Sequence, residues 1–325
     1  MDDLTDLEHI RKRPSRYIGD TTVRGLHHLF DELLDNSIDP FLANRVTSVA
    51  ASTSGSTLEF SDDGPGLPFD ERRSNTESLA TYYLTEIRRD SPTADGHTPH
   101  IHLGGWGCGL RIVTALTETC VVSSRRNKNL WQQSFSKGLA DGPATVTSQN
   151  GDRGTTFRLG IDREFFSVDW CQDRIDQRLQ DAAYLFPGLC VESPNRQFIA
   201  ERGLADLASK IANKADSSNA DKVWWFNEST DDMHIQAAIA GTIDGDTQWR
   251  AFANGSASVE NGTHLTAFKK VVAACKIKPA IALIHVVMRN PRFVGPTRTK
   301  LDVPEILLPI YDALKPSLTE FVSNS

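Results

Sequence analysis

The sequence predicts an α+β protein with two domains. Its 325 residues correspond to about two domains of ordinary size. Segments with the apolar spacing of helices and short strand-like segments both occur in the first half and again in the second. A polar segment, Asp216–Asp221, lies between the halves, so the predicted domains are 1–215 and 216–325.

The first half begins with a predicted helix at 22–39, where apolar residues recur at the spacing of one buried face. Pro40 is expected to end this helix, because the residue before a proline is disfavoured in the helical region. Strands are expected at 46–52 and 57–61, followed by a turn at Asp62–Gly66. Two further helices and three strands of one sheet follow: helices at 109–117 and 174–185, strands at 120–124, 131–136 and 155–159.

The second half predicts a smaller domain made of the same kinds of element. Its expected strands are 235–240, 248–254 and 280–288, of which the last is strongly apolar. Helices are expected at 265–274 and 305–322, and the second of these is amphipathic.

Composition and charge argue against several classes of function. The chain has 35 basic and 42 acidic residues, a net charge of −7, which argues against direct DNA binding over a large surface. Met1–Arg13 lacks the apolar core of a secretion signal, and no window reaches the ~18 apolar residues of a membrane span. The five cysteines form no CxxC pair, which favours reduced thiols. These features predict a cytoplasmic protein without membrane contact.

His28, Glu32 and Asn36 form the first group of residues that can carry chemistry. A step of four residues keeps all three on one helix stripe. Glu32 can take a proton from water or position it, His28 can orient Glu32, and Asn36 can bind Mg²⁺ through its amide oxygen. The spacing alone favours a solvated helix face over a reactive site.

Two glycine-containing turns form the second and third groups. Asp62-Asp63-Gly64-Pro65-Gly66 follows a predicted strand, where a carboxylate can accept a hydrogen bond from an exocyclic amine. An ordinary Asp-Gly turn has the same pattern. The segment 104–109 opens a predicted helix, and bare amides there can bind an anion. It follows an irregular stretch, 91–105, which is a candidate lid, with the glycine segment as its hinge.

The order of these motifs resembles the GHKL ATPases, the superfamily of gyrase B, Hsp90, MutL and histidine kinases. The resemblance is most specific to the ATPase region of bacterial DNA gyrase B and its topoisomerase IV counterpart. It is carried by Ile10–Asp20, Gly25–Asp39, the two glycine turns, and Gly154-Thr155. Later, Gly262–Phe268 resembles the transducer domain, and Asn290–Leu301 resembles the loop that reaches back to the γ-phosphate. The resemblance implies a Bergerat sandwich of helices on a mixed sheet, followed by a ribosomal-S5-like transducer domain.

The resemblance also implies ATP and Mg²⁺ as cofactors and a role for each matching residue. Glu32 would be the general base, assisted by His28, and Asn36 would hold Mg²⁺. Asp62 would bind the adenine amine. The remaining positions would surround the nucleotide: Gly64, Gly66 and Thr155 at the base, Gly105, Gly107 and Gly109 at the phosphates, and Arg298 where the family has a γ-phosphate lysine.

The chain departs from the family pattern at four places. The glycine loop is one residue shorter, with Trp106 in place of Leu-His, and Pro65 replaces an arginine. Residues 296–298 are Pro-Thr-Arg instead of Gln-Thr-Lys, and arginine presents a planar fork where lysine presents a point charge. Most of the N-terminal arm that crosses to a partner subunit is missing before Asp6, which weakens the expectation of a homodimer.

Three functions stay open at this point. The first is Mg²⁺-dependent ATP hydrolysis by a gyrase-B-like module that lacks TOPRIM and DNA-cleavage domains, with a homodimer or a separate subunit in trans as possible partners. The second is phosphoryl transfer to an acceptor other than water by a free-standing biosynthetic or signalling enzyme. The third is non-catalytic binding of a nucleotide or a gyrase inhibitor. The short arm favours a free-standing module over a piece of a longer subunit.

Overall fold

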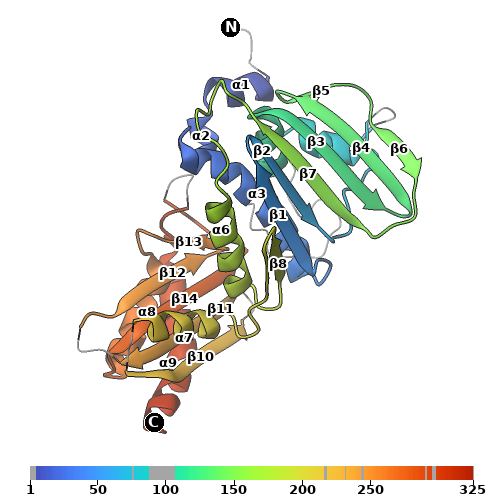
Figure 1. Cartoon of the computed structure of the whole chain (residues 1–325). Helices are drawn as coiled ribbons and strands as arrows, with labels where there is room; N and C mark the ends of the chain where they lie inside the picture. The colour runs from blue at the N-terminus through green and yellow to red at the C-terminus, as the bar shows by residue number, and fades with distance from the viewer. Residues whose placement is uncertain are drawn as a thin grey trace. The chain divides into compact units, whose positions relative to one another are not determined.

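The computed structural model describes residues 5–74, 77–87, 107–215, 218–230, 232–242, 245–289, 291–294 and 298–324, which form two compact units (Figure 1). Unit 1 comprises Met1–Gln180 and Leu189–Phe198, and unit 2 comprises Asp181–Gly188 and Ile199–Ser325. The predicted boundary at 215/216 therefore lies inside unit 2. Helix α7 (Leu204–Lys214) precedes that boundary, but it packs on the strands that follow it.

Unit 1 is built on a nine-stranded mixed sheet with the order β5-β4-β3-β7-β2-β1-β8-β9, in which β6 also pairs with β4. β1 and β8 are parallel, and the other neighbours are antiparallel. The strands are β1 (Ser48–Ser54), β2 (Thr57–Asp62), β3 (Thr117–Arg126), β4 (Asn129–Ser136), β5 (Leu139–Ala140), β6 (Thr145–Ser148), β7 (Gly154–Ile161), β8 (Cys190–Ser193) and β9 (Arg196–Phe198). The three strands predicted to share one sheet are neighbours in it, as β4, β3 and β7.

Helix α3 is the central helix of unit 1, and it spans Val23–Leu42. The predicted apolar face is buried, and Phe30 contacts Phe60 of β2 with ring centroids 5.8 Å apart. The expectation that Pro40 ends the helix is wrong. A proline close to the end of a helix removes one backbone hydrogen bond, while its fixed φ is compatible with helical geometry.

The other helices of unit 1 are short, apart from α6. They are α1 (Asp6–Lys12), α2 (Ser15–Ile18), α4 (Leu79–Thr85), α5 (Gly109–Ala115) and α6 (Gln172–Leu185), whose last residues belong to unit 2. α5 contacts α3, α4 and β3. This packing brings the start of α5 to the stripe of α3 that carries the predicted catalytic residues.

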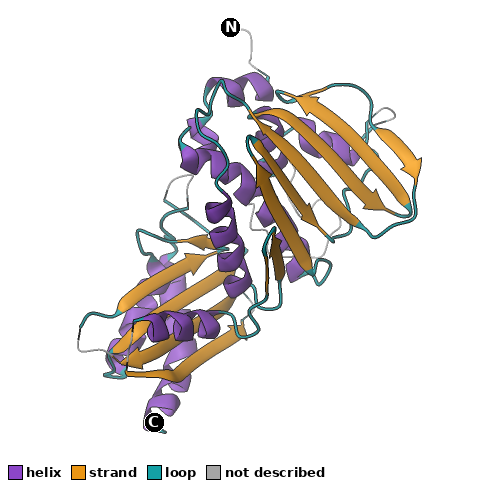
Figure 2. Cartoon of the chain, viewed as in Figure 1, coloured by secondary structure: helices purple, strands orange, loops and turns teal. Residues whose placement is uncertain are grey.

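Unit 2 contains a five-stranded sheet with the order β10-β11-β14-β12-β13. Its elements are β10 (Ser218–Ser229), β11 (Met233–Thr242), β12 (Gln248–Ala253), β13 (Ser256–Ala257), α8 (Thr263–Ala274), β14 (Pro279–Met288), the 3-10 turn Pro304–Ile306, and α9 (Leu307–Ser323). Every residue of β14 is buried, as expected for a central strand that is covered on both faces. Figure 2 shows helices packed on the sheet of each unit, which agrees with the predicted α+β class.

Alternating residues of β11 face the two layers of helices in unit 2. Ile235 and Ile239 belong to the core that includes Phe268 of α8 and Leu314 of α9. Gln236, which points to the opposite face, donates from Nε2 to the carbonyl oxygen of Leu185 at 2.7 Å. The second sheet with helices is consistent with the predicted transducer-like domain.

Candidate functional site

The predicted stripe of α3 forms a contacting group. Nε2 of His28 lies 3.3 Å from Oε1 of Glu32, and Nδ2 of Asn36 donates to the backbone oxygen of Glu32 at 2.8 Å. The Glu32 side chain is 12% exposed and that of His28 is 20% exposed, whereas Asn36 is exposed. Glu32 therefore does not lie on a fully solvated face, and a carboxylate beside an imidazole is a suitable arrangement for proton transfer.

The second carboxylate oxygen of Glu32 faces the start of α5. A Cβ atom at Gly109 would lie 2.2 Å from Oε2 of Glu32, so a side chain at this position would displace the Glu32 carboxylate. Gly107, just before it, has a φ of 62°. Gly105 lies outside the described residues. The end of the glycine loop and Glu32 therefore lie next to each other. The sequence indicated this proximity only through the order of its motifs.

Asp62 lies at the end of β2 with both oxygens held. Oδ1 accepts from the amide of Gly64 at 2.8 Å, and Oδ2 accepts from Oγ of Ser37 on α3 at 3.0 Å. Burial raises the pKa of Asp62 to about 6, in opposition to these hydrogen bonds, which lower it. At neutral pH the carboxylate is ionised but poorly solvated, so it is well suited to accept a hydrogen bond from an amine.

Gly64 and Thr155, two of the positions predicted to lie at the base, contact Asp62, and their contact with a base stays a prediction. Thr155 of β7 is buried and pairs with Asp62 across the β2–β7 ladder. Its hydroxyl lies 3.4 Å from Oγ of Ser124, which accepts from the amide of Leu67 at 2.7 Å. Gly66 has a φ of 76°, and a Cβ there would lie 2.6 Å from the carbonyl oxygen of Arg125. Close backbone approach therefore defines this end of the site.

The adjacent histidines of α3 have different surroundings. Nδ1 of His27 donates to the carbonyl oxygen of Val23 at 2.7 Å, and its Nε2 accepts from the amide of Cys171 at 3.1 Å. These bonds fix one neutral tautomer, which ties α3 to the segment before α6. The His27 side chain thus has a structural role, which leaves His28 as the histidine that contacts Glu32.

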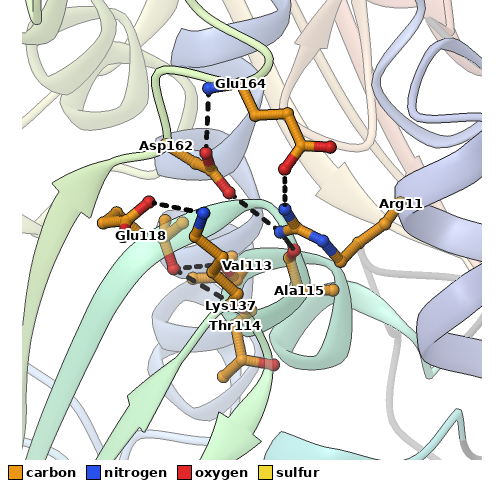
Figure 3. A network of polar contacts seen from close by, with 9 residues as sticks. Arg11, Val113, Thr114, Ala115, Glu118, Lys137, Asp162 and Glu164 are labelled. Atoms are coloured by element: carbon orange, nitrogen blue, oxygen red, sulfur yellow. Dashed lines mark hydrogen bonds and ion pairs between the residues drawn. The ribbon is translucent and has the colours of Figure 1, made fainter.

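Arg11 joins the far end of α5 to the rest of unit 1, a role the sequence did not predict (Figure 3). One of its NH groups donates to the carbonyl oxygen of Ala115 at 2.8 Å and to the buried Asp162 at 2.9 Å. The other donates to Glu164 at 2.6 Å, and the guanidinium lies 4.7 Å from the Phe165 ring centroid. In the sequence, Arg11 is part of the Ile10–Pro14 motif, but that motif does not indicate which residues Arg11 contacts.

Arg298 belongs to unit 2, at the end of the segment whose residues 295–297 lie outside the described ranges. Its backbone φ is 53°. The residues that follow it are anchored within unit 2, because the amides of Val294 and Thr263 donate to the carbonyl oxygens of Lys300 and Leu301 at 2.9 and 3.0 Å. The predicted contact of Arg298 with a γ-phosphate stays a prediction.

The donor set of unit 1 suits a nucleotide with a magnesium ion. Within the described residues, no group of three His, Cys, Asp or Glu side chains is placed to hold a metal. A metal at Asn36 would then take one protein oxygen, with phosphates and water as its other ligands, which is a common arrangement for Mg²⁺. Helices long and apolar enough to cross a membrane are absent from the described part of the chain.

Residues 21–164 match the family of histidine kinase-, DNA gyrase B- and HSP90-like ATPases. The chain thus contains a GHKL-type ATPase domain in this region, which confirms the predicted resemblance and supports ATP binding and ATPase activity at the level of the family.

Named relatives agree with this assignment. The chain is 27% identical to the DNA gyrase B protein of Clostridium acetobutylicum, over 93% of this chain and 52% of the relative. It is 28% identical to the DNA gyrase B protein of Thermotoga maritima, over 97% of this chain and 55% of the relative. The chain thus spans about half the length of the curated relatives it matches.

The fold matches ATPase regions over nearly the whole chain. The 43K ATPase domain of Thermus thermophilus gyrase B superposes with a TM-score of 0.83 at 25% identity, covering 99% of this chain and 91% of that chain. The ATPase region of Saccharomyces cerevisiae topoisomerase II gives a TM-score of 0.72 at 17% identity, covering 100% and 99%. These matches confirm the predicted fold class, including its second, sheet-containing part.

Proposed function

We propose that the chain binds ATP with Mg²⁺ in unit 1 and hydrolyses it. The observation that carries this proposal is the position of Glu32, which has one carboxylate oxygen on His28 and the other against the glycine that opens α5. A general base must lie within reach of both its orienting partner and the reacting phosphate. This arrangement meets the first condition, and it brings Glu32 to the loop expected to hold phosphates.

Each side chain has a distinct task in the proposed reaction. Asp62 accepts a hydrogen bond from the exocyclic amine of adenine, and the amides near Gly107 and Gly109 bind phosphate oxygens. Asn36 holds the magnesium ion, which neutralises phosphate charge when bound. Glu32 takes a proton from the attacking water as the oxygen of that water bonds to the γ-phosphorus and the bond to the bridging oxygen breaks. His28 orients Glu32 during this step.

Two further parts of the proposal rest on the gyrase B resemblance. Arg298 supplies a positive charge to the γ-phosphate. The chain works with a second copy of itself or with a separate subunit, as that resemblance implies. Cross-linking or sedimentation with and without a non-hydrolysable ATP analogue tests this association.

The substitution Glu32→Gln tests the proposed hydrolysis. We expect it to preserve the rise in melting temperature caused by ATP and Mg²⁺ and to reduce phosphate release by about 10²–10⁴-fold. The matched control is Glu59→Gln, because Glu59 is exposed on β2 and has no part in the site. Phosphate release by Glu32→Gln at the rate of the Glu59 variant would contradict the assignment. Wild-type release with ATP and Mg²⁺ alone separates hydrolysis from transfer to another acceptor.

A further inference from the structure

Behind His28 lies a second carboxylate that the proposed reaction does not use. Oδ2 of Asp31 is 4.0 Å from Nδ1 of His28, while Nε2 of the same ring is 3.3 Å from Oε1 of Glu32. Both ring nitrogens therefore face carboxylates. An ionised carboxylate can only accept, so a hydrogen bond between the ring and Glu32 needs a proton on Nε2.

Asp31 is itself held in place by an arginine from a distant part of the chain. Nε of Arg178 on α6 donates to Oδ1 of Asp31 at 2.8 Å, and its NH2 nitrogen lies 3.7 Å from Oδ1 of Asp35. The Arg178 side chain is 19% exposed and that of Asp31 is 35% exposed. One guanidinium thus bridges two carboxylates one helical turn apart, which fixes Asp31 with its second oxygen toward His28.

We propose that Asp31 and Arg178 are positioning residues for the catalytic pair His28–Glu32. Arg178 holds Asp31, Asp31 holds the imidazole of His28 as a donor through Nε2, and the imidazole holds Glu32 Oε1. Oε2 of Glu32 then stays directed at the start of α5, where the phosphates are proposed to bind. This inference rests on the proposed function for its effect on turnover, but the coupling between Asp31 and His28 can be measured without any nucleotide.

The first measurement is an NMR titration of His28 in the wild-type chain and in two variants. The charged groups around the ring include Asp31 and Glu32 on α3 and, behind Asp31, Arg178 on α6. Removing the negative charge at position 31 disfavours the protonated ring, so Asp31→Asn should lower the titration midpoint of His28 by about one pH unit. Asp35→Asn is the matched control, since it removes the other carboxylate of Arg178 and should leave the midpoint unchanged.

The second measurement separates positioning from a merely structural role. Asp31→Asn should lower kcat for ATP hydrolysis on the order of tenfold, a fraction of what a general base contributes, and leave KM nearly unchanged. Asp31→Glu should restore part of kcat, because a carboxylate three residues from His28 still reaches the ring. Arg178→Gln should lower kcat in the same direction. Melting temperatures of all variants are measured alongside.

The outcomes are distinguishable. An unchanged His28 midpoint in Asp31→Asn overturns the proposal whatever the activity is. A loss of kcat that Asp31→Glu does not restore, accompanied by an equal loss in Asp35→Asn, also overturns it, because a general loosening of α6 from α3 would then explain both. A shifted midpoint together with normal turnover in Glu32→Gln would leave the His28 coupling intact and would instead refute the proposed hydrolysis.

Discussion

Asp62 and Asp63 are adjacent in sequence, yet their carboxylates should respond to substitution in opposite ways. Burial raises the pKa of Asp62 from 3.8 to about 6, against the hydrogen bonds from Gly64 and Ser37. Burial also raises the pKa of Asp63, but hydrogen bonds from Thr47 and Ser48 outweigh this effect, and the net pKa is lowered. The folded ligand-free protein therefore disfavours the charge of Asp62 and favours that of Asp63.

The magnitude for Asp62→Asn follows from the shift. A rise of about two pKa units corresponds to about 3 kcal/mol, an upper limit because the side chain is only partly buried. An acid with a raised pKa in the folded state costs no stability below pH 3.8 and its full amount above pH 6. Asparagine preserves the acceptor for the Gly64 amide and offers a donor to Ser37. We therefore expect the variant to be more stable than wild type at pH 8.

The assay is thermal or urea unfolding of wild type, Asp62→Asn and Asp63→Asn between pH 4 and pH 8, with and without ATP and Mg²⁺. Asp62→Asn should gain stability at pH 8, lose that gain toward pH 4, and show no stabilisation by ATP, because the acceptor for the adenine amine is weakened. Asp63→Asn should lose stability at pH 8 and still respond to ATP. Stabilisation of Asp62→Asn by ATP equal to that of wild type would refute the role of Asp62, and destabilisation at pH 8 would refute the argument from burial.

Three further predictions follow from single contacts. Gly109→Ala should displace Glu32 and lower the rate of ATP hydrolysis by about 100-fold in a phosphate-release assay. The control is Gly142→Ala, which should keep the wild-type rate because no atom lies within 4 Å of the added Cβ. Burial lowers the pKa of His264 to about 4, so stability should fall by about 3 kcal/mol as the pH drops from 6.5 to 4, and urea unfolding of His264→Leu should lack this slope. Arg11→Ala leaves the buried Asp162 without its cation, so the free energy of unfolding should fall by about 3 kcal/mol. Arg202→Ala removes an exposed ion pair and should lower it by under about 1 kcal/mol. Equal losses of the two variants in urea unfolding would refute this reasoning.

Periodicity and motif order predicted the elements that bury a continuous apolar face or close a glycine turn. Helix α3, strand β14 and the sheet neighbours β4, β3 and β7 have strong local patterns, and their positions agree with the sequence within a few residues. The short helices α1, α2 and α4 and the exposed strand β6 were missed. They have four to seven residues, too few for a period to be recognised.

The predicted domain boundary at 215/216 rested on the polar composition of a short segment, whereas the two units are defined by contacts between elements. Asp216–Asp221 is polar, and β10 begins within it at Ser218 because the rest of that strand pairs with β11. α7 precedes the polar segment and buries its apolar face on the second sheet. Polarity in a short segment therefore marks a surface turn or a strand end as readily as a linker between domains.

Local sequence patterns predict even less of the candidate site, because its chemistry depends on contacts between residues far apart in the chain. Helical spacing places His28 near Glu32, but it cannot show that Gly109 gives Glu32 its space, or that Arg178 holds Asp31 across 147 positions. α5 makes this dependence concrete. Its seven residues span about 10 Å, with Gly109 against Glu32 at one end and the Ala115 carbonyl oxygen on Arg11 at the other. The first motif of the sequence, through Arg11, and the proposed catalytic residue Glu32 therefore contact opposite ends of the same short helix.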